Sequence, residues 1–228
     1  KKKDAIDRAE AVVKRAPPSA ELYVIAARAH EAADDPRRAE ELLRLAIERE
    51  PSRIAAYAML AKLYVRDNQL DSAQQQLEQL LKRDPKSIPI NTMLGMLLET
   101  KHDLPGAEQQ YTKTLSFDPK ASVAANNLAW LYVSSNRNLE MALQLAQTAQ
   151  QSLPEDPQIN DTLGWAYFRK GMYAQAVQRL EISARREPND PGIYYHLGMA
   201  YVLNNDPVRG KKALQRAVSL NPAFDGAD

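Results

Sequence analysis

The stretch from residue 160 to residue 188 decides the fold, and it reads NDTLGWAYFRKGMYAQAVQRLEISARREP. Leu163, Gly164 and Tyr167 follow one another at the spacing of one helix face, and Ala176 and Leu180 do the same in the second half. A lysine and a glycine separate the halves, which is a turn signal. The stretch therefore predicts two short helices folded back on each other.

The same pattern recurs along the chain, and proline sets its period. Proline cannot continue a helix, and it disfavours helical geometry at the residue before it, so each of these prolines closes a helical run. The spacing is 34 residues, with a single interval of 35, for Pro17, Pro51, Pro85, Pro119, Pro154, Pro188 and Pro222. We expect the extra residue to lie in the turn Ser134–Asn138.

Small residues form two columns in this register. The first helix of each unit carries Ala27, Ala61, Gly95, Ala129, Gly164 and Gly198. The second helix carries Ala39, Ala73, Ala107, Ala142, Ala176 and Gly210. Glycine inside a helix costs about 1 kcal/mol relative to alanine, so the recurring glycines indicate that two helix backbones must approach closely. The columns predict an all-α array of antiparallel helix pairs.

These residues resemble the tetratricopeptide repeat family. The resemblance implies a right-handed α-solenoid, a superhelix in which the first helix of each pair lines a concave groove. It divides the chain into repeats at residues 20–53, 54–87, 88–121, 122–156, 157–190 and 191–222. Residues 1–19 then form the second helix of a truncated preceding repeat, and 223–228 form a short tail. We expect the chain to be a piece of a longer protein, because neither end shows a polar capping helix.

A few positions depart from the family pattern. Asn91, Ala125 and Asn160 replace the first aromatic residue of their repeats, which is expected to loosen local packing. His30 and Leu98 replace the tyrosine of their repeats. The other four repeats have tyrosine in this column, so we interpret His30 as a core residue. His102 falls in a turn and is expected to be solvated.

Composition excludes several classes of function. The 228 residues are 44% hydrophobic and 26% charged, with a net charge of +1 and no cysteine. A charge so close to zero argues against nucleic acid as a partner, and no stretch approaches the roughly 20 apolar residues of a membrane span. No catalytic, metal-binding or cofactor-binding motif is present. The sequence therefore predicts no enzyme, no metal site and no cofactor.

The family pattern assigns groove-facing positions to the later repeats. These candidate partner-binding residues are Asn126, Asn127, Trp130, Asp161, Thr162, Trp165, Phe168, Arg169, Tyr195, His196 and Met199. Aromatic side chains and arginine dominate binding hot spots. In the alternative interpretation, the two tryptophans wedge between adjacent first helices and stay half-buried. Met93 and Met96 in the earlier repeats are interpreted as packing between repeats.

The preferred function is a scaffold that binds a protein or peptide partner in the groove. Two alternatives stay open, namely assembly into a homo-oligomer and a scaffolding arm of an exopolysaccharide synthesis or export complex. The run around Trp130, Trp165 and His196 is similar to late repeats of bacterial envelope proteins, including lipoproteins of exosortase (PEP-CTERM) systems. That similarity implies the bacterial periplasm or cell envelope, with the cytoplasm as the alternative.

Overall fold

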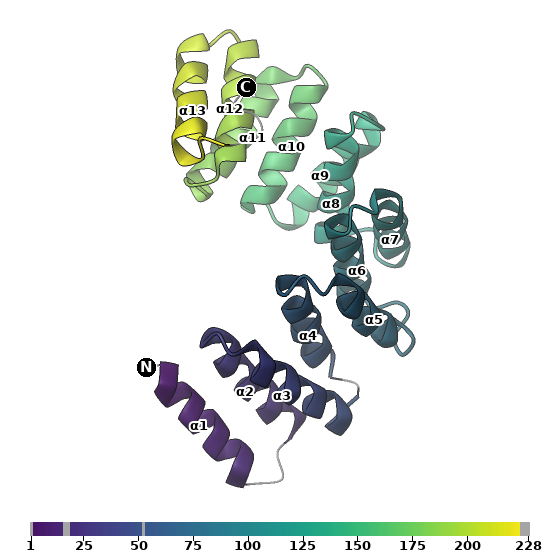
Figure 1. The fold of residues 1–228 in the computed structure, drawn as a ribbon. Helices are drawn as coiled ribbons and strands as arrows, with labels where there is room; N and C mark the ends of the chain where they lie inside the picture. Colours follow the sequence, from purple (N-terminus) through teal and green to yellow (C-terminus); the bar gives the residue numbers. More distant parts are fainter. Residues whose placement is uncertain (1, 16–18, 52, 224–228) are drawn as a thin grey trace. The chain divides into compact units, whose positions relative to one another are not determined.

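The computed structural model describes residues 2–15, 19–51 and 53–223, and these residues form thirteen α-helices (Figure 1). The helices are α1 (Lys2–Arg15), α2 (Ala20–Ala32), α3 (Pro36–Arg49), α4 (Ile54–Arg66), α5 (Leu70–Leu81), α6 (Ile88–Thr100), α7 (Leu104–Phe117), α8 (Ser122–Ser134), α9 (Leu139–Ser152), α10 (Pro157–Arg169), α11 (Tyr173–Arg186), α12 (Pro191–Leu203) and α13 (Pro207–Leu220). Among the described residues, no helix is both long and apolar enough to cross a bilayer.

Each even-numbered helix from α2 to α12, called a first helix below, is joined to the next by a short turn. The turns contain three residues, except for the four residues 135–138 between α8 and α9. The additional residue therefore lies in the predicted turn. The second residue of each turn is left-handed, and these residues are Asp34, Asn68, His102, Asn136, Gly171 and Asn205. Turns this short reverse the chain, so the prediction of an all-α array of antiparallel helix pairs is confirmed.

Aspartate and proline start four of the helices. The aspartate side chain accepts a hydrogen bond from a backbone N–H of the first turn, which satisfies one of the donors that a helix leaves open. The proline that follows needs no hydrogen-bond acceptor at that position. This arrangement begins α3, α10, α12 and α13 at Asp35-Pro36, Asp156-Pro157, Asp190-Pro191 and Asp206-Pro207.

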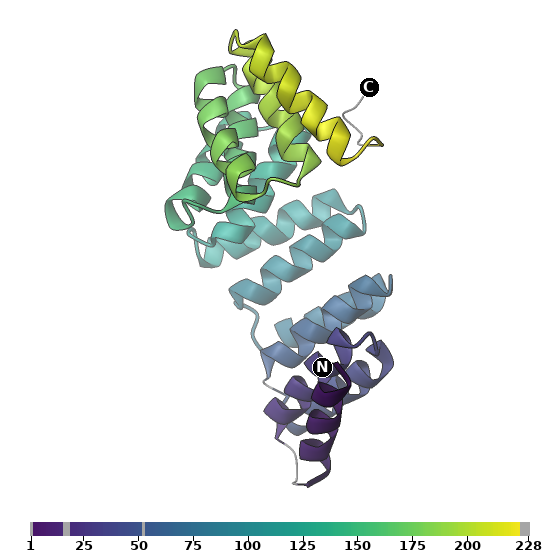
Figure 2. The ribbon, with the colours of Figure 1, turned by 90° about the vertical axis from the view of Figure 1, so that its left-hand side faces the viewer.

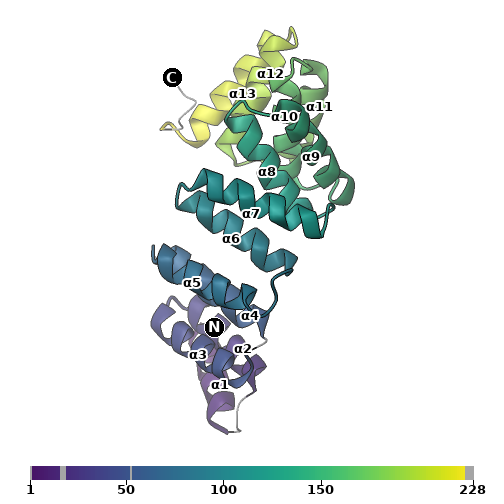
Figure 3. The ribbon, with the colours of Figure 1, turned by 90° about the vertical axis from the view of Figure 1, so that its right-hand side faces the viewer.

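The chain divides into two compact units, residues 1–110 and residues 111–228, and the boundary falls inside α7. In the N-terminal unit each helix from α1 to α5 packs against the next one in the chain (Figures 1 and 3). The C-terminal unit repeats this order from α8 to α13 (Figure 2). There the first helices also touch one another, because α10 contacts both α8 and α12.

The small columns lie where paired helices meet. A β-carbon added at Gly164 would lie 3.3 Å from the carbonyl oxygen of Ala176, and one added at Gly198 would lie 3.0 Å from the backbone nitrogen of Leu214. A β-carbon at Gly210 would lie 3.1 Å from the carbonyl oxygen of Gly198. These separations are shorter than ordinary van der Waals contact, so the backbones approach as closely as the sequence predicted.

Two departures from the family pattern turn out to be buried and hydrogen-bonded to the backbone. Asn91 and Asn160 are completely buried. The side-chain amide of Asn91 donates to the carbonyl oxygens of Pro85 and Ser87, at 3.1 and 2.8 Å. The amide of Asn160 makes the equivalent bonds to the loop before α10. The expectation of looser packing was wrong at these two positions, because the amide holds the loop between repeats instead of filling space with a ring.

Candidate partner-binding surface

The eleven candidate residues come together on three adjacent first helices of the C-terminal unit. Helix α8 carries Asn126, Asn127 and Trp130; α10 carries Asp161, Thr162, Trp165, Phe168 and Arg169; α12 carries Tyr195, His196 and Met199. Because α10 contacts both neighbours, side chains on one helix reach those on the next. The structure separates the eleven into a buried layer and a half-exposed layer.

Trp165 forms the centre of the buried layer. Its ring stacks on Phe168, with 4.3 Å between ring centroids and 6° between the ring planes. It also stacks on His196, at 4.2 Å and 24°. Trp165 is 8% exposed. This is closer to the alternative interpretation, in which the tryptophan wedges half-buried between first helices, and the observed burial is even greater. Offset stacking of this kind stabilises by about 0.5–1.5 kcal/mol beyond the area buried.

His196 links all three helices. Its Nδ1 lies 2.8 Å from Oδ1 of Asp161, and both side chains are 10% exposed. Its ring also lies 5.8 Å from the ring of Trp130, tilted by 54°. A buried carboxylate is costly unless it is hydrogen-bonded, so the Asp161–His196 bond satisfies a group that could otherwise not be buried there. The pair fixes α12 against α10.

The other buried candidates are polar. Asn126 and Thr162 are at most 9% exposed. The hydroxyl of Thr162 donates to the carbonyl oxygen of Gln158 within α10. The side-chain oxygen of Asn126 is buried without a hydrogen-bond partner. Buried oxygen atoms of this kind are uncommon in folded proteins.

The half-exposed layer comprises the remaining candidates, which are Asn127, Trp130, Phe168, Arg169, Tyr195 and Met199. Asn127 donates to the hydroxyl of Tyr111 at 3.2 Å. The ring of Tyr195 lies 6.3 Å from that of Trp165, so it borders the buried stack. This layer combines aromatic rings, a thioether, an amide and a guanidinium. The sequence pattern selected the right helices but did not distinguish the two layers.

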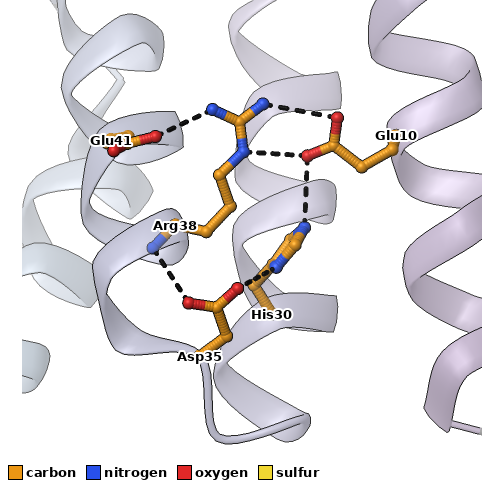
Figure 4. Close-up of polar contacts among 5 residues, drawn as sticks. All are labelled: Glu10, His30, Asp35, Arg38 and Glu41. Atoms are coloured by element: carbon orange, nitrogen blue, oxygen red, sulfur yellow. Dashed lines mark hydrogen bonds and ion pairs between the residues drawn. The ribbon is translucent and has the colours of Figure 1, made fainter.

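His30 is buried in the N-terminal unit, as predicted, and it lies in a cluster of charged side chains (Figure 4). Its Nδ1 lies 2.9 Å from Oδ2 of Asp35, and its Nε2 lies 3.3 Å from Oε1 of Glu10. Arg38 donates to the same Glu10 carboxylate at 2.8 Å and to Glu41 at 2.8 Å. The cluster ties α1 to α2 and α3.

The charges of this cluster affect one another. The hydrogen bond from His30, followed by the backbone N–H of Arg38, lowers the pKa of Asp35. The bond to Glu10 raises the pKa of Arg38. No group of three or more His, Asp or Glu residues among the described residues is arranged to hold a metal ion. Because its hydrogen bonds and ion pairs join α1, α2 and α3, we interpret the cluster as an ion-pair network that fixes these helices.

The tyrosine column has the same structural role in other repeats. The hydroxyl of Tyr201 donates to Glu181 at 2.6 Å, and the side chain of Gln147 donates to the hydroxyl of Tyr167 at 3.2 Å. Each pair spans 20 residues and joins a first helix to the preceding second helix, as His30 and Glu10 do. Burial, followed by the bond to Glu181, raises the pKa of Tyr201 to about 12. These links are structural, and the sequence pattern showed the column but not its polar partners.

Comparison with known proteins identifies the family. Two family models, both described as tetratricopeptide repeat, match residues 31–97 and residues 162–226. The chain is a tetratricopeptide repeat protein. One match falls in each compact unit of the repeat protein. No curated protein matches its sequence.

Solved structures of other repeat proteins are similar in fold. One is the Cut9–Hcn1 hetero-tetramer of the APC/C, with a TM-score of 0.81 and 15% identity over 100% of this chain, which spans 45% of the length of that chain. Another is PilF of Pseudomonas aeruginosa, with a TM-score of 0.76 and 15% identity over 97% of this chain and 96% of that chain. A third, YrrB, is described as a TPR protein with an unusual peptide-binding site (TM-score 0.61, 19% identity, 82% of this chain and 96% of that chain). At these identities the likeness shows the fold alone.

Proposed function

We propose that this repeat protein is an interaction scaffold that binds a segment of a partner protein across α8, α10 and α12. The observation that supports the proposal is the half-exposed layer, in which Trp130, Arg169 and Tyr195 lie on three touching helices. Tryptophan, tyrosine and arginine are the residue types most enriched in binding hot spots. Repeat families of this kind typically have no enzymatic activity, and the family matches include no catalytic domain.

The buried layer supports the proposal by making the surface rigid. Trp165 is held between Phe168 and His196, and His196 is held by Asp161. A side chain whose rotamer is already locked loses little conformational entropy when a partner binds. The half-exposed rings of Trp130 and Tyr195 lie 5.8 and 6.3 Å from rings of this layer. These contacts restrict their rotamers before binding, which favours affinity.

Adjacent residues on α12 provide a matched test. Tyr194 and Tyr195 are both half-buried, but the ring of Tyr194 lies near Arg216 of α13, at 5.9 Å from its guanidinium carbon, and that of Tyr195 borders Trp165. A random-peptide display library is panned on the immobilised protein, and the dissociation constants of the selected peptides are measured by calorimetry. We expect Tyr195→Ala and Trp130→Ala to weaken binding by about tenfold or more, as hot-spot residues do.

Tyr194→Ala is the matched control variant. Tyr194→Ala should change the dissociation constant by less than about threefold, because its ring faces α13. Circular dichroism of each variant checks that the fold is retained. Selected peptides that bind all three variants as tightly as the unaltered protein would show that the partner does not lie across these helices.

A second candidate function is self-association through α13. Leu214 and Val218 of α13 correspond, 34 residues earlier, to Leu180 and Ala184, which α12 helps to bury in the core of the C-terminal unit. On α13 the same face lines an open apolar hollow, and Val218 is 43% exposed. Sedimentation velocity at increasing concentration tests this function. A monomer at every concentration would exclude it, whereas a dimer that Val218→Glu dissociates would support it.

The cellular process in which the protein takes part is a different question from how it binds a partner. PilW, a further structural relative with a TM-score of 0.73 and 16% identity over 91% of this chain, is described as a type IV pilus biogenesis factor. None of the relatives named here is described as part of an exopolysaccharide export system. The link to such systems and to the cell envelope therefore stays a prediction from the sequence.

A further inference from the structure

A small apolar pocket opens between α4, α5 and α6 of the N-terminal unit, with a volume of about 190 Å³. Its floor consists of Ala61, Leu77 and Leu97, which are at most 3% exposed. Met93 and Met96 form one wall, and Met96 is 46% exposed. Solvent therefore reaches a hollow whose base belongs to the hydrophobic core.

The opposite side of the pocket comes from α4. Val65 is 37% exposed, and Lys62 lies at the edge with its ammonium group 3.1 Å from a carboxylate oxygen of Glu31. An ion pair thus stands at the edge of an otherwise apolar hollow. The pocket lies entirely within the N-terminal unit and is distinct from the surface proposed on α8, α10 and α12.

The repeat register shows what fills the same place elsewhere in the chain. The residue that corresponds to each member of the pocket is found 103 residues further on, between α10, α11 and α12. The corresponding pairs are Ala61 and Gly164, Lys62 and Trp165, Val65 and Phe168, Leu77 and Leu180, Met93 and His196, Met96 and Met199, Leu97 and Ala200, and Thr100 and Leu203. The floor residues correspond to small or apolar residues in the C-terminal unit. Lys62, Val65 and Met93 correspond there to residues with rings.

In the C-terminal unit these rings occupy the space. Trp165 stacks between Phe168 and His196, at centroid distances of 4.3 and 4.2 Å. The space between two first helices of this chain is therefore suited to flat aromatic groups. In the N-terminal unit, α4 carries Lys62 and Val65 where α10 carries Trp165 and Phe168. The space between the helices stays open there.

We propose that the pocket between α4, α5 and α6 receives one aromatic side chain of a partner polypeptide, which takes the place that Trp165 occupies in the C-terminal unit. The proposal rests on the role of this protein as an interaction scaffold, but on different residues from the surface across α8, α10 and α12. It adds the chemistry of one anchor residue in the partner.

The size of the pocket selects a single side chain. An apolar cavity of about 150 Å³ is sufficient for benzene, whereas pockets for whole small-molecule ligands start at about 300 Å³. The methionines of the wall favour an aromatic group over an aliphatic one, because thioether sulfur atoms, here those of Met93 and Met96, attract aromatic rings.

The test uses the methionine methyl groups as reporters. The six methionines of the chain are labelled with ¹³C at the methyl carbon, and their NMR signals are followed while N-acetyl-L-tryptophanamide is added to the millimolar range. An aromatic ring in the pocket shifts the signals of Met93 and Met96 through its ring current. N-acetyl-L-leucinamide is the aliphatic control probe.

We expect saturable shifts at Met93 and Met96, with the tryptophan probe bound roughly three- to tenfold more tightly than the leucine probe. Lys62→Trp introduces the residue type of position 165 and should abolish these shifts by filling the pocket. Lys82→Trp is the matched control, because Lys82 is exposed and does not line the pocket, and it should leave the shifts unchanged. Circular dichroism confirms that both variants are folded.

Three outcomes would overturn the proposal: no saturable shift at the two methyl groups, equal affinity for both probes, or shifts that persist in the Lys62→Trp variant. The first would mean that the methionine side chains close the pocket in solution, and the second that it takes any apolar group. None of them affects the surface on the C-terminal unit, because that surface is tested separately by Tyr195→Ala and Trp130→Ala. The two proposals can therefore fail independently.

Discussion

Trp165 and His196 stack on each other with 4.2 Å between their ring centroids, and the carboxylate of Asp161 holds the histidine in place through a hydrogen bond. This contact joins α10 to α12 through side chains that the packing columns of the repeat do not include. The residues chosen as binding candidates thus contribute first to the cohesion of the C-terminal unit. Their half-exposed neighbours are the residues left to meet a partner.

Removing the central ring should destabilise the C-terminal unit. We expect Trp165→Ala to lower the free energy of unfolding by about 3–5 kcal/mol, because a buried tryptophan leaves a cavity and two unstacked rings. Trp130→Ala should cost less, since Trp130 is only half-buried. Urea denaturation followed by circular dichroism measures both. Equal losses in the two variants would contradict the division into a buried and a half-exposed layer.

The carboxylate of Asp161 should be replaceable by an amide but not by a methyl group. The side-chain amide oxygen that Asp161→Asn introduces can still accept a hydrogen bond from Nδ1 of His196, so we expect a loss below about 1 kcal/mol. Asp161→Ala leaves the buried histidine nitrogen without a partner and should cost about 1–3 kcal/mol. The same denaturation experiment separates the two. If Asp161→Ala were as stable as Asp161→Asn, the bond would not contribute to stability.

Glycine at position 198 should resist even the smallest enlargement. In the Gly198→Ala variant the new methyl group would meet Cγ of Leu214 at 2.6 Å and its backbone nitrogen at 3.0 Å. Overpacking of this kind costs about 1–3 kcal/mol, which exceeds the gain of about 1 kcal/mol that alanine brings to a helix. We therefore expect a net loss of stability in thermal unfolding. Gly171→Asn, in an open left-handed turn, is the control and should be close to neutral.

The turn between α6 and α7 offers a stabilising substitution. His102 is exposed and left-handed, with φ of 59°, at a turn position occupied elsewhere by aspartate, asparagine or glycine. A left-handed backbone costs most residues about 1–2 kcal/mol, and asparagine tolerates it better. We expect His102→Asn to raise the free energy of unfolding by up to about 1 kcal/mol. An unchanged free energy of unfolding would mean that contacts of the histidine side chain offset the cost of its left-handed backbone.

The sequence predicted the fold far better than the site. The proline period and the small columns report backbone geometry directly, since a residue such as Gly164 is demanded by one close approach to Leu180. Whether a ring such as Trp165 points to solvent or into a neighbouring helix depends on the next repeat, and no pattern within one helix records it. The fully buried Asn160 shows the same limit, because its role depends on loop carbonyl oxygens that the sequence does not display.

The N-terminal unit should lose stability in acid partly through Asp35. The hydrogen bond from His30 lowers the pKa of Asp35 below its ordinary value of 3.8. A group whose pKa is lower in the folded state contributes stability above its unfolded pKa, and loses it as the pH falls through the folded one. The contribution is therefore complete above about pH 4–5 and disappears below that. It is small, because the Asp35 side chain is 47% exposed and solvent screens its interactions.

Asp35→Asn isolates this contribution, because asparagine also caps helices well and keeps the start of α3 intact. Unfolding free energies measured in urea between about pH 2.5 and pH 6 should fall less steeply in the variant than in the unaltered protein. Asp34→Asn is the matched control, since Asp34 is the exposed neighbour in the same turn. A slope that is unchanged by Asp35→Asn, or changed equally by both substitutions, would show that the bond between His30 and Asp35 does not couple protonation to folding.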